Sequence, residues 1–295
     1  MVVLNWLRFI AVALALSFMA ADIRAAEDLP LVDTALLDSV DVSNSVDEHR
    51  YKLQKEGIAE ALEDKGVLDA ITGGTAGGIL FGMVTWADRP SFVMPWVRIS
   101  TKEEALAVAA KVRKLQLQSG EFTCMTRMLR SVNDKIVPQI PAKATRIVVD
   151  VSGDGPDNCN ADETIETVRD ELVATGVTLN GLPINEGDPS APVGEGAYRA
   201  PGTAFKDSAL AKPNAGPVTL EDWYRAHVMG GVGSFVLPAN GYADFGRAMR
   251  QKFVIEISGI KPQPRFGAEA LVDERFVEVE RGAETLGAGL ARQLQ

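Results

Sequence analysis

Five side chains that offer oxygen ligands fall in three short segments of the chain. Asp41, Ser43 and Ser45 alternate directly after an apolar stretch. Asp154 follows a second apolar stretch, and Thr123 stands at the start of a predicted helix between the two. Carboxylate and hydroxyl oxygens are the ligands that hard cations such as Mg²⁺ and Mn²⁺ prefer. These residue types therefore predict a site for Mg²⁺ or Mn²⁺, with the alternating side chains curled around one ion and Asp154 on its opposite side.

Other kinds of chemical site are poorly represented in the sequence. Two cysteines and two histidines, His49 and His227, are too few for a four-cysteine zinc site or a histidine-rich metal centre. The chain has no Gly-x-Ser-x-Gly segment of the kind that holds a nucleophilic serine at a strand-to-helix turn. The glycine-rich segment 73–78 follows a predicted helix and precedes a predicted strand, the reverse of the order in a phosphate-binding loop. An oxygen-only cation site is therefore the favoured chemistry.

Strands and helices must alternate to bring the three segments together. Apolar runs predict strands over 31–42, 79–86, 91–99, 146–151 and 177–184, with a short strand over 234–237. Helical spacing of apolar residues predicts helices over 47–70, 123–136, 219–228 and 241–257, one that begins at Thr101, and one capped by Asn160 or Asp162. The short turn after 79–86 allows only an antiparallel pair with the next strand. The pattern predicts an α/β fold in which helices cover both faces of a mostly parallel sheet with one antiparallel edge strand.

This sheet would explain how the metal ligands converge. Ligands of open α/β sheets bind beyond the carboxyl ends of the strands, which is where Asp41 and Asp154 would stand. Asp38 and Ser39 are less expected, because they interrupt the apolar pattern inside the first strand. A buried carboxylate without a partner costs several kcal/mol, so Asp38 needs a partner, access to water, or a strand register that exposes it.

The two ends of the chain and one internal segment differ from the domain between them. Residues 1–25 are typical of a signal peptide, with Arg8 before an apolar run that is too short to span a bilayer comfortably. An uncleaved membrane anchor is the alternative. The domain itself is predicted over 31–258, with a surface insertion rich in glycine, proline and alanine at 186–217. Residues 259–295 form a separate tail.

Charge and compartment narrow the class of protein further. The chain of 295 residues has a net charge of −10, which argues against a nucleic-acid partner because such partners need clustered lysine and arginine. No segment after the signal peptide is long and apolar enough to form a transmembrane helix. Cleavage of the signal peptide would therefore release the chain into a bacterial periplasm or outside the cell. In such an oxidising compartment, Cys124 and Cys159 could form a disulfide or remain two buried thiols.

Taken in order, these segments resemble the metal-ion-dependent adhesion site of von Willebrand factor A domains. The resemblance implies a three-layer α/β/α, Rossmann-like fold. It also implies that Ser43, Ser45 and Thr123 bind the ion through their hydroxyls. Asp41 and Asp154 would bind the ion directly or through water. In that family, an acidic side chain of a protein partner often completes the coordination of the metal.

The resemblance is closer to one bacterial branch of these domains, the exported domain-of-unknown-function 1194 family. Four segments carry this resemblance, at 41–47, 149–156, 180–184 and 230–235. Together they span roughly residues 31–258, most of the predicted mature chain. This family implies no activity that could be transferred to the chain.

The resulting prediction is an exported, non-enzymatic binding module that holds Mg²⁺ or Mn²⁺ and accepts an acidic side chain from a protein partner. A metal-assisted hydrolase at the same site is the alternative, although no general base is evident and an aspartyl phosphatase would need a second aspartate where Ser43 stands. A third reading is a structural interaction protein with a vestigial metal site, whose insertion or tail holds the partner. Within the site, Thr126 remains an alternative to Thr123.

Overall fold

The computed structural model describes residues 29–159, 163–193 and 218–259. The predicted signal peptide lies outside the described residues, as do most of the predicted insertion, the tail beyond Gly259, and the predicted helix caps Asn160 and Asp162. No helix in the described part of the chain combines the length and the apolar character needed to cross a membrane.

The centre of the fold is a sheet of five strands: β1 (Leu31–Asp41), β2 (Ile79–Trp86), β3 (Pro90–Ile99), β4 (Lys143–Gly153) and β5 (Val177–Pro183). Their spatial order is β3-β2-β1-β4-β5. β1 pairs in parallel with both β2 and β4, and β4 pairs in parallel with β5. The edge pair of β2 and β3 is antiparallel, as the short turn between them requires. The predicted mostly parallel sheet with one antiparallel edge strand is confirmed.

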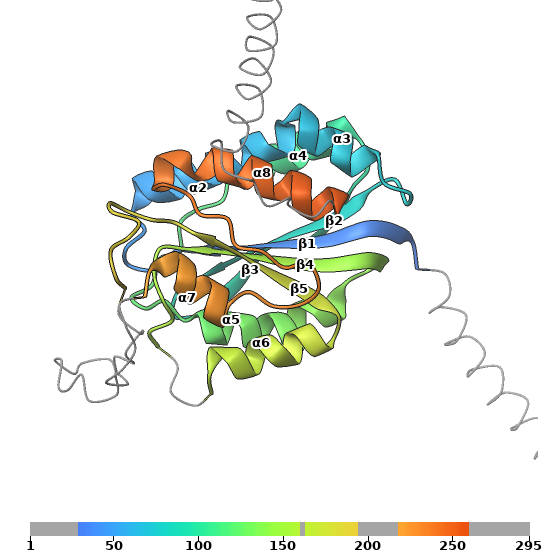
Figure 1. The fold of residues 1–295 in the computed structure, drawn as a ribbon. Helices are drawn as coiled ribbons and strands as arrows, with labels where there is room; N and C mark the ends of the chain where they lie inside the picture. Colours follow the sequence, from blue (N-terminus) through green and yellow to red (C-terminus); the bar gives the residue numbers. More distant parts are fainter. Residues whose placement is uncertain (1–28, 160–162, 194–217, 260–295) are drawn as a thin grey trace, which may run out of the picture. The chain divides into compact units, whose positions relative to one another are not determined.

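Helices cover both faces of the sheet (Figure 1). One face carries α2 (Glu48–Glu63), α3 (Lys65–Thr72), α4 (Lys102–Val112) and α8 (Phe245–Ser258). The other face carries α5 (Met125–Ser131), α6 (Ile165–Ala174) and α7 (Leu220–His227). Successive residues of a strand point to opposite faces, so Leu36 of β1 packs in the core under the first set of helices and Leu37 in the core under the second. The described residues therefore form three layers, helix, sheet and helix.

The parallel register of β1 and β4 brings two of the metal-site segments to one edge of the sheet. Val40 of β1 lies opposite Ser152 of β4. Asp41 is the last residue of β1, and Gly153, directly before Asp154, is the last residue of β4. Because both strands run in the same direction, their carboxyl ends meet, and the two aspartates leave the sheet side by side.

The helix predicted over 47–70 is in fact two helices. α2 ends at Glu63, and Asp64 adopts an extended conformation that interrupts the helical path. The Asp64 carboxylate accepts hydrogen bonds from the backbone nitrogens of Gly66 (2.8 Å) and Val67 (3.2 Å), which makes it the N-cap of α3. A local capping interaction thus overrides an apolar periodicity that continues through it.

Two other boundaries also differ from the prediction. α5 begins at Met125 rather than Thr123, and its last turn is followed by a π-helical turn over Val132–Ile136. α6 is capped by Thr164, whose hydroxyl accepts a hydrogen bond of 3.2 Å from the backbone nitrogen of Thr167. The later start of α5 leaves Thr123 in a loop.

The strand predicted over 234–237 is an irregular extension of the sheet and not a regular strand. Val236 forms a parallel bridge with Gly181 of β5, and Ala239 forms a second bridge farther along. The segment enters through Gly231 and Gly233, which have φ values of 89° and 78°. Such left-handed conformations bend the chain out of the extended form, so the pairing beyond β5 is interrupted.

Asp38 lies in the core and belongs to a cluster of buried charges. In the sheet register its neighbour is Asp150 of β4, and the next is Asn180 of β5. Lys252 of α8 lies against them, with its Nζ 3.1 Å from Asp150 Oδ1 and 3.0 Å from Glu256 Oε1. Asn180 donates a hydrogen bond of 2.8 Å to Glu256. Asp38, Asp150 and Lys252 have no exposed surface. We call these five residues the buried charge cluster.

The buried charge cluster contains three carboxyl groups and one ammonium group. Burial, followed by repulsion from Asp150 and Glu256, raises the pKa of Asp38 well above its ordinary value, although Lys252 opposes the shift. Burial and the charge of Glu256 likewise raise the pKa of Asp150 to about 8. Burial alone would lower the pKa of Lys252, but attraction to Asp150 and Glu256 raises it. The raised pKa means that Asp38 favours its protonated form, in a position beside a buried lysine and without exposed surface.

The raised pKa values predict how stability depends on pH. Above about pH 4 the unfolded chain releases protons that the folded chain keeps on Asp38 and, up to about pH 8, on Asp150, so the free energy of unfolding falls as the pH rises. Asp38→Asn removes one of these groups and should make the fall shallower. The free energy of unfolding of the variant should therefore rise relative to that of the wild type between pH 5 and pH 8. Urea unfolding at several pH values measures the slope. Asp170→Asn, at an exposed acid, is the control, and its free energy of unfolding should change with pH as that of the wild type does. The same slope for Asp38→Asn would contradict the prediction.

Candidate metal centre

The five predicted ligands lie together at the carboxyl edge of the sheet. The Oγ atoms of Ser43 and Ser45 are 3.3 Å apart, and Thr123 donates a hydrogen bond of 3.3 Å to Ser43 Oγ. Ser45 donates a hydrogen bond of 2.7 Å to Asp154 Oδ1. Asp41 is joined to the group through its Oδ1, which lies 2.8 Å from the backbone nitrogen of Ser43. Three loops thus bring two carboxylates and three hydroxyls to one place.

Local hydrogen bonds shape the loop that follows β1. The Asp41 carboxylate accepts a hydrogen bond from the backbone of Ser43, which turns the chain immediately after the strand. The carbonyl of Ser43 accepts from the backbone nitrogen of Val46 at 2.8 Å. Asp47 then caps α2 by accepting from the backbone nitrogen of Arg50 at 2.8 Å. Because Asp47 is the helix cap, the preceding aspartate and serines are available for another role.

Asp41 is the more deeply buried of the two carboxylate ligands. Its side chain has no exposed surface, and its Oδ2 has no hydrogen-bond partner among the described residues. Burial, followed by repulsion from Asp154, raises the pKa of Asp41 to about 7, although hydrogen bonds from Ser43 oppose the shift. A buried polar atom without a partner is costly. Asp41 therefore gains free energy from binding either a proton or a cation.

The surroundings of Asp41 Oδ2 fit a cation. A Cβ atom at Gly153 would lie 2.9 Å from Asp41 Oδ2 and 2.8 Å from the hydroxyl of Tyr224, so a side chain there would occupy the space beside the free oxygen. Among the described residues, no group of three carboxylate, imidazole or thiolate side chains could hold a metal ion. A metal bound here would therefore depend on the hydroxyl oxygens, and an oxygen-only donor set suits Mg²⁺ or Mn²⁺.

The structure distinguishes between the two candidate threonines. The Thr123 hydroxyl reaches Ser43, whereas the Thr126 hydroxyl, inside α5, donates to Asp157. Since α5 begins only at Met125, Thr123 is free of the helical path and its side chain can turn toward the sheet edge. Thr123, and not Thr126, is the threonine that joins the cluster.

The loop that carries Asp154 is attached to the segment that carries Thr123. A disulfide joins Cys124 to Cys159, with their Cα atoms 5.1 Å apart. The backbone nitrogen of Thr123 donates to Asn158 Oδ1 at 2.9 Å, and the backbone nitrogen of Asn158 donates to the Thr123 carbonyl at 3.1 Å. From the sequence, Asn158 could either border the metal site or shape the turn after Asp154, and no pattern connects it with Thr123.

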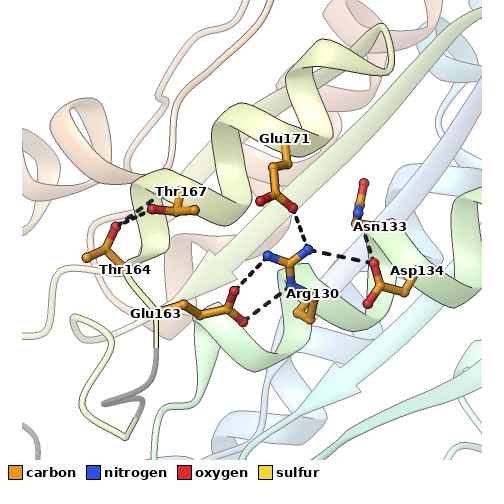
Figure 2. A network of polar contacts seen from close by, with 7 residues as sticks. All are labelled: Arg130, Asn133, Asp134, Glu163, Thr164, Thr167 and Glu171. Carbon is orange, nitrogen blue, oxygen red and sulfur yellow. Dashed lines mark hydrogen bonds and ion pairs between the residues drawn. The ribbon is translucent and has the colours of Figure 1, made fainter.

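A second connection between the same elements lies farther from the cluster (Figure 2). Arg130 of α5 pairs with Glu163, just before α6, at 2.6 Å and with Glu171 of α6 at 2.5 Å. A longer contact of 3.7 Å reaches Asp134. Each of these partly exposed pairs contributes modestly to stability, but together they hold α6 against α5 at the far end of the loop.

Three residues that sequence reasoning missed border the cluster on its other side. Tyr242 donates a hydrogen bond of 2.9 Å to Asp154 Oδ2. The backbone nitrogen of Tyr242 donates to Glu186 at 3.2 Å, and Glu186 pairs with Arg50 at 3.2 Å. The Arg50 guanidinium donates to the carbonyl of Ser45 and lies over the Tyr242 ring. Tyr242 and Asp154 are 88 positions apart in the sequence, so no local motif could indicate this contact.

The fold is that of von Willebrand factor A domains. One solved structure, proximal thread matrix protein 1 from the mussel byssus with a zinc-occupied MIDAS motif, matches with a TM-score of 0.53 and 15% sequence identity. Another, a von Willebrand factor type A protein from Catenulispora acidiphila, matches with a TM-score of 0.51 and 14% identity. Both matches cover 77% of this chain but only 48% and 43% of those proteins, so the chain spans less than half their length. At this level of identity the likeness shows the fold alone.

Within this fold class, the chain belongs to the DUF1194 family. The family, described as a protein of unknown function, matches residues 31–261. Curated proteins give no match to the sequence. The resemblance drawn from the four sequence segments is therefore confirmed, and it brings no activity with it.

The raised pKa of Asp41 predicts that metal binding depends on pH. A divalent cation at the cluster must displace the proton that Asp41 holds below about pH 7, so Mn²⁺ should bind more tightly as the pH rises from 6 to 8, by up to about tenfold per unit below the pKa. Calorimetric titration at three pH values, in two buffers of different ionisation enthalpy, measures both affinity and proton release. A wild-type affinity that stays constant, with no proton released, would contradict the prediction.

Proposed function

We propose that this chain is an exported, metal-dependent protein-binding module. Mg²⁺ or Mn²⁺ would be held by the hydroxyls of Ser43, Ser45 and Thr123 and by the carboxylates of Asp41 and Asp154, directly or through water. The bound cation would in turn accept an acidic side chain from a protein partner. The observation that carries this proposal is the convergence of the five oxygen donors at one edge of the sheet, where the buried Oδ2 of Asp41 has no partner among the described residues.

The open coordination positions of the ion, rather than the charge balance of the cluster, leave a place for an acidic ligand from outside. Two carboxylates and three neutral hydroxyls can at most balance the charge of one divalent ion, and each hydroxyl is a weaker donor than a carboxylate. Mg²⁺ keeps several coordination positions for water, and these positions can exchange for a carboxylate. Ser45 is exposed and Asp154 is partly exposed, so a partner's side chain can approach the ion from the solvent. The charge of the ion makes that contact much stronger than a neutral hydrogen bond.

Two features support export. The predicted signal peptide over 1–25 precedes the described domain, and the Cys124–Cys159 disulfide suits an oxidising compartment such as the bacterial periplasm. The fold and the family of the chain are compatible with a location in the periplasm or outside the cell. A periplasmic or secreted module would meet its protein partner, and its metal ion, outside the cytoplasm.

The first prediction concerns the metal. Titration of Mg²⁺ or Mn²⁺ into the chelator-treated chain should give one ion per chain, because the cluster has one set of donors. Asp41→Ala and Asp154→Ala should each weaken metal binding by more than about 100-fold, because each removes a charged ligand. This loss is larger than the one usual for a residue that only orients a ligand. Asp69→Ala, at an exposed acid of α3, is the control and should bind as the wild type does.

Other results of that titration would point elsewhere. A folded wild-type chain that binds neither ion would contradict the proposal and favour a vestigial site. Phosphate release from a generic phosphoester, lost in Asp41→Ala, would support the metal-assisted hydrolase instead.

The second prediction concerns the partner. Proteins captured by the immobilised chain from periplasmic extract in the presence of Mn²⁺ should be released by EDTA, because the ion forms part of the contact surface. The same proteins should be absent when Asp41→Ala is the bait and present with Asp69→Ala. Quantitative mass spectrometry of the eluates measures the ratio. A partner retained equally by all baits, with or without EDTA, would show that another surface holds it.

A further inference from the structure

The connection between the Thr123 segment and the Asp154 loop has an unusual position relative to the metal ligands. It consists of the Cys124–Cys159 disulfide and the two hydrogen bonds that Thr123 and Asn158 exchange. We call these contacts the loop clamp. One end of the loop clamp is the ligand Thr123 itself, and its other end lies four and five residues beyond the ligand Asp154.

The Thr123 end of the clamp has little other support from its own helix. α5 is only seven residues long, and Cys124 at its N-cap position makes no side-chain capping hydrogen bond. Both of the main-chain polar groups of Thr123 are engaged by Asn158. Thr123 is 6% exposed and Cys124 is 1% exposed, so the segment is pressed against the sheet edge. Asp88 also holds this segment by accepting from the backbone nitrogens of Glu121 and Phe122, but the main-chain groups of Thr123 itself are held by the Asp154 loop.

The other end of the clamp lies in a loop that would otherwise be held mainly by polar contacts. From Asp154 the chain passes through Gly155 before it reaches the clamp, and a Cβ at Gly155 would meet no atom within 4 Å. Asp157 accepts a hydrogen bond from the Thr126 hydroxyl, and Asn158 Oδ1 accepts one from the backbone nitrogen of Thr123. The position of the Asp154 loop therefore depends in turn on the Thr123 segment.

We propose that the loop clamp is a positioning element of the metal centre, and that its disulfide makes divalent-cation affinity depend on the oxidation state of the chain. With the S–S bond closed, the segments that carry Thr123 and Asp154 are held together at the edge of the sheet. With the bond open, the two loops keep only their hydrogen bonds and spend less time at the separation that both ligands require. The inference rests on the proposed metal site and adds that the oxidation state of the disulfide regulates its affinity for the metal.

The chemistry of opening is a two-electron reduction. A phosphine such as TCEP attacks one sulfur and breaks the S–S bond, each sulfur takes up one proton, and water supplies the oxygen of the resulting phosphine oxide. A cellular dithiol would do the same by thiol–disulfide exchange, becoming a disulfide itself. Cys124 and Cys159 are 1% and 9% exposed, so reduction in the native state should be slow, and substitution is the cleaner test.

The experiment compares Mn²⁺ affinity in the oxidised wild-type chain and in the double variant Cys124→Ala/Cys159→Ala. Residues that orient metal ligands typically change affinity by 10–100-fold, so the double variant should bind Mn²⁺ about tenfold more weakly. Binding is measured by calorimetry well below the unfolding temperature, with circular dichroism to verify the fold. The electron paramagnetic resonance spectrum of bound Mn²⁺ should also change, since one ligand is less well placed. TCEP should weaken binding to the wild type and leave the double variant unaffected.

A control separates positioning from general loss of stability. Arg113→Met breaks ion pairs with Glu56 and Glu63 between α4 and α2, in the helical layer on the other face of the sheet. This variant should lower the melting temperature and leave the Mn²⁺ affinity and spectrum at their wild-type values. If Arg113→Met weakened Mn²⁺ binding as much as the double variant does, the effect would be one of stability and the inference would be wrong.

The remaining outcomes distinguish this inference from the proposed function. A double variant that binds Mn²⁺ with wild-type affinity overturns the loop clamp and leaves the metal site intact. An oxidised wild type that binds no Mn²⁺ overturns both. If the double variant does not fold, the wild-type chain reduced by TCEP until both thiols are free carries the test: weaker Mn²⁺ binding and an altered spectrum support the loop clamp, and unchanged binding overturns it.

Discussion

The repulsion between Asp41 and Asp154 at the carboxyl edge of the sheet is the constraint on which the site depends. Asp41 has no contact with water, and its Oδ2 has no hydrogen-bond partner among the described residues. The surrounding hydroxyls can orient their dipoles toward a carboxylate, but they cannot neutralise two negative charges. Only a proton or a cation can do so. The arrangement is therefore better suited to a bound ion than to a hydrogen-bonded turn, and this reason supports the proposed metal site.

The rest of the fold holds this edge in place from both faces of the sheet. On one face, the loop clamp and the ion pairs of Arg130 tie the Asp154 loop to α5 and α6. On the other face, Tyr242, just before α8, donates to Asp154. Farther along α8, Lys252 enters the buried charge cluster and pairs with Asp150 of β4. Because β4 leads directly into Asp154, the same strand and the same helix join the buried charge cluster to the candidate metal centre.

Much of the fold could be predicted because its signals are local. The long apolar runs of β1 and β4 and the short turn before β3 specify a mostly parallel sheet with an antiparallel edge. The predictions were wrong where a local interaction competed with the apolar pattern. Asp64 caps a second helix inside a continuous periodicity, and left-handed glycines interrupt the strand expected over 234–237. The unusual position of Asp38 could be seen from its place in β1, but Lys252, which pairs with the neighbouring Asp150, lies on α8 and has no signal near β1.

The sequence by itself determined the candidate ligands Asp41, Ser43, Ser45 and Asp154, because each stands at the end of a strand whose position follows from nearby residues. It could not choose between Thr123 and Thr126, decide whether Asn158 borders the site, or indicate Tyr242. The tertiary structure decided these, because each depends on a contact between distant segments. Thr123 meets Ser43 across 80 positions, and Tyr242 meets Asp154 across 88. Such contacts exist only once strand register and helix packing have set the distances between loops, and no pattern within a single segment encodes those distances.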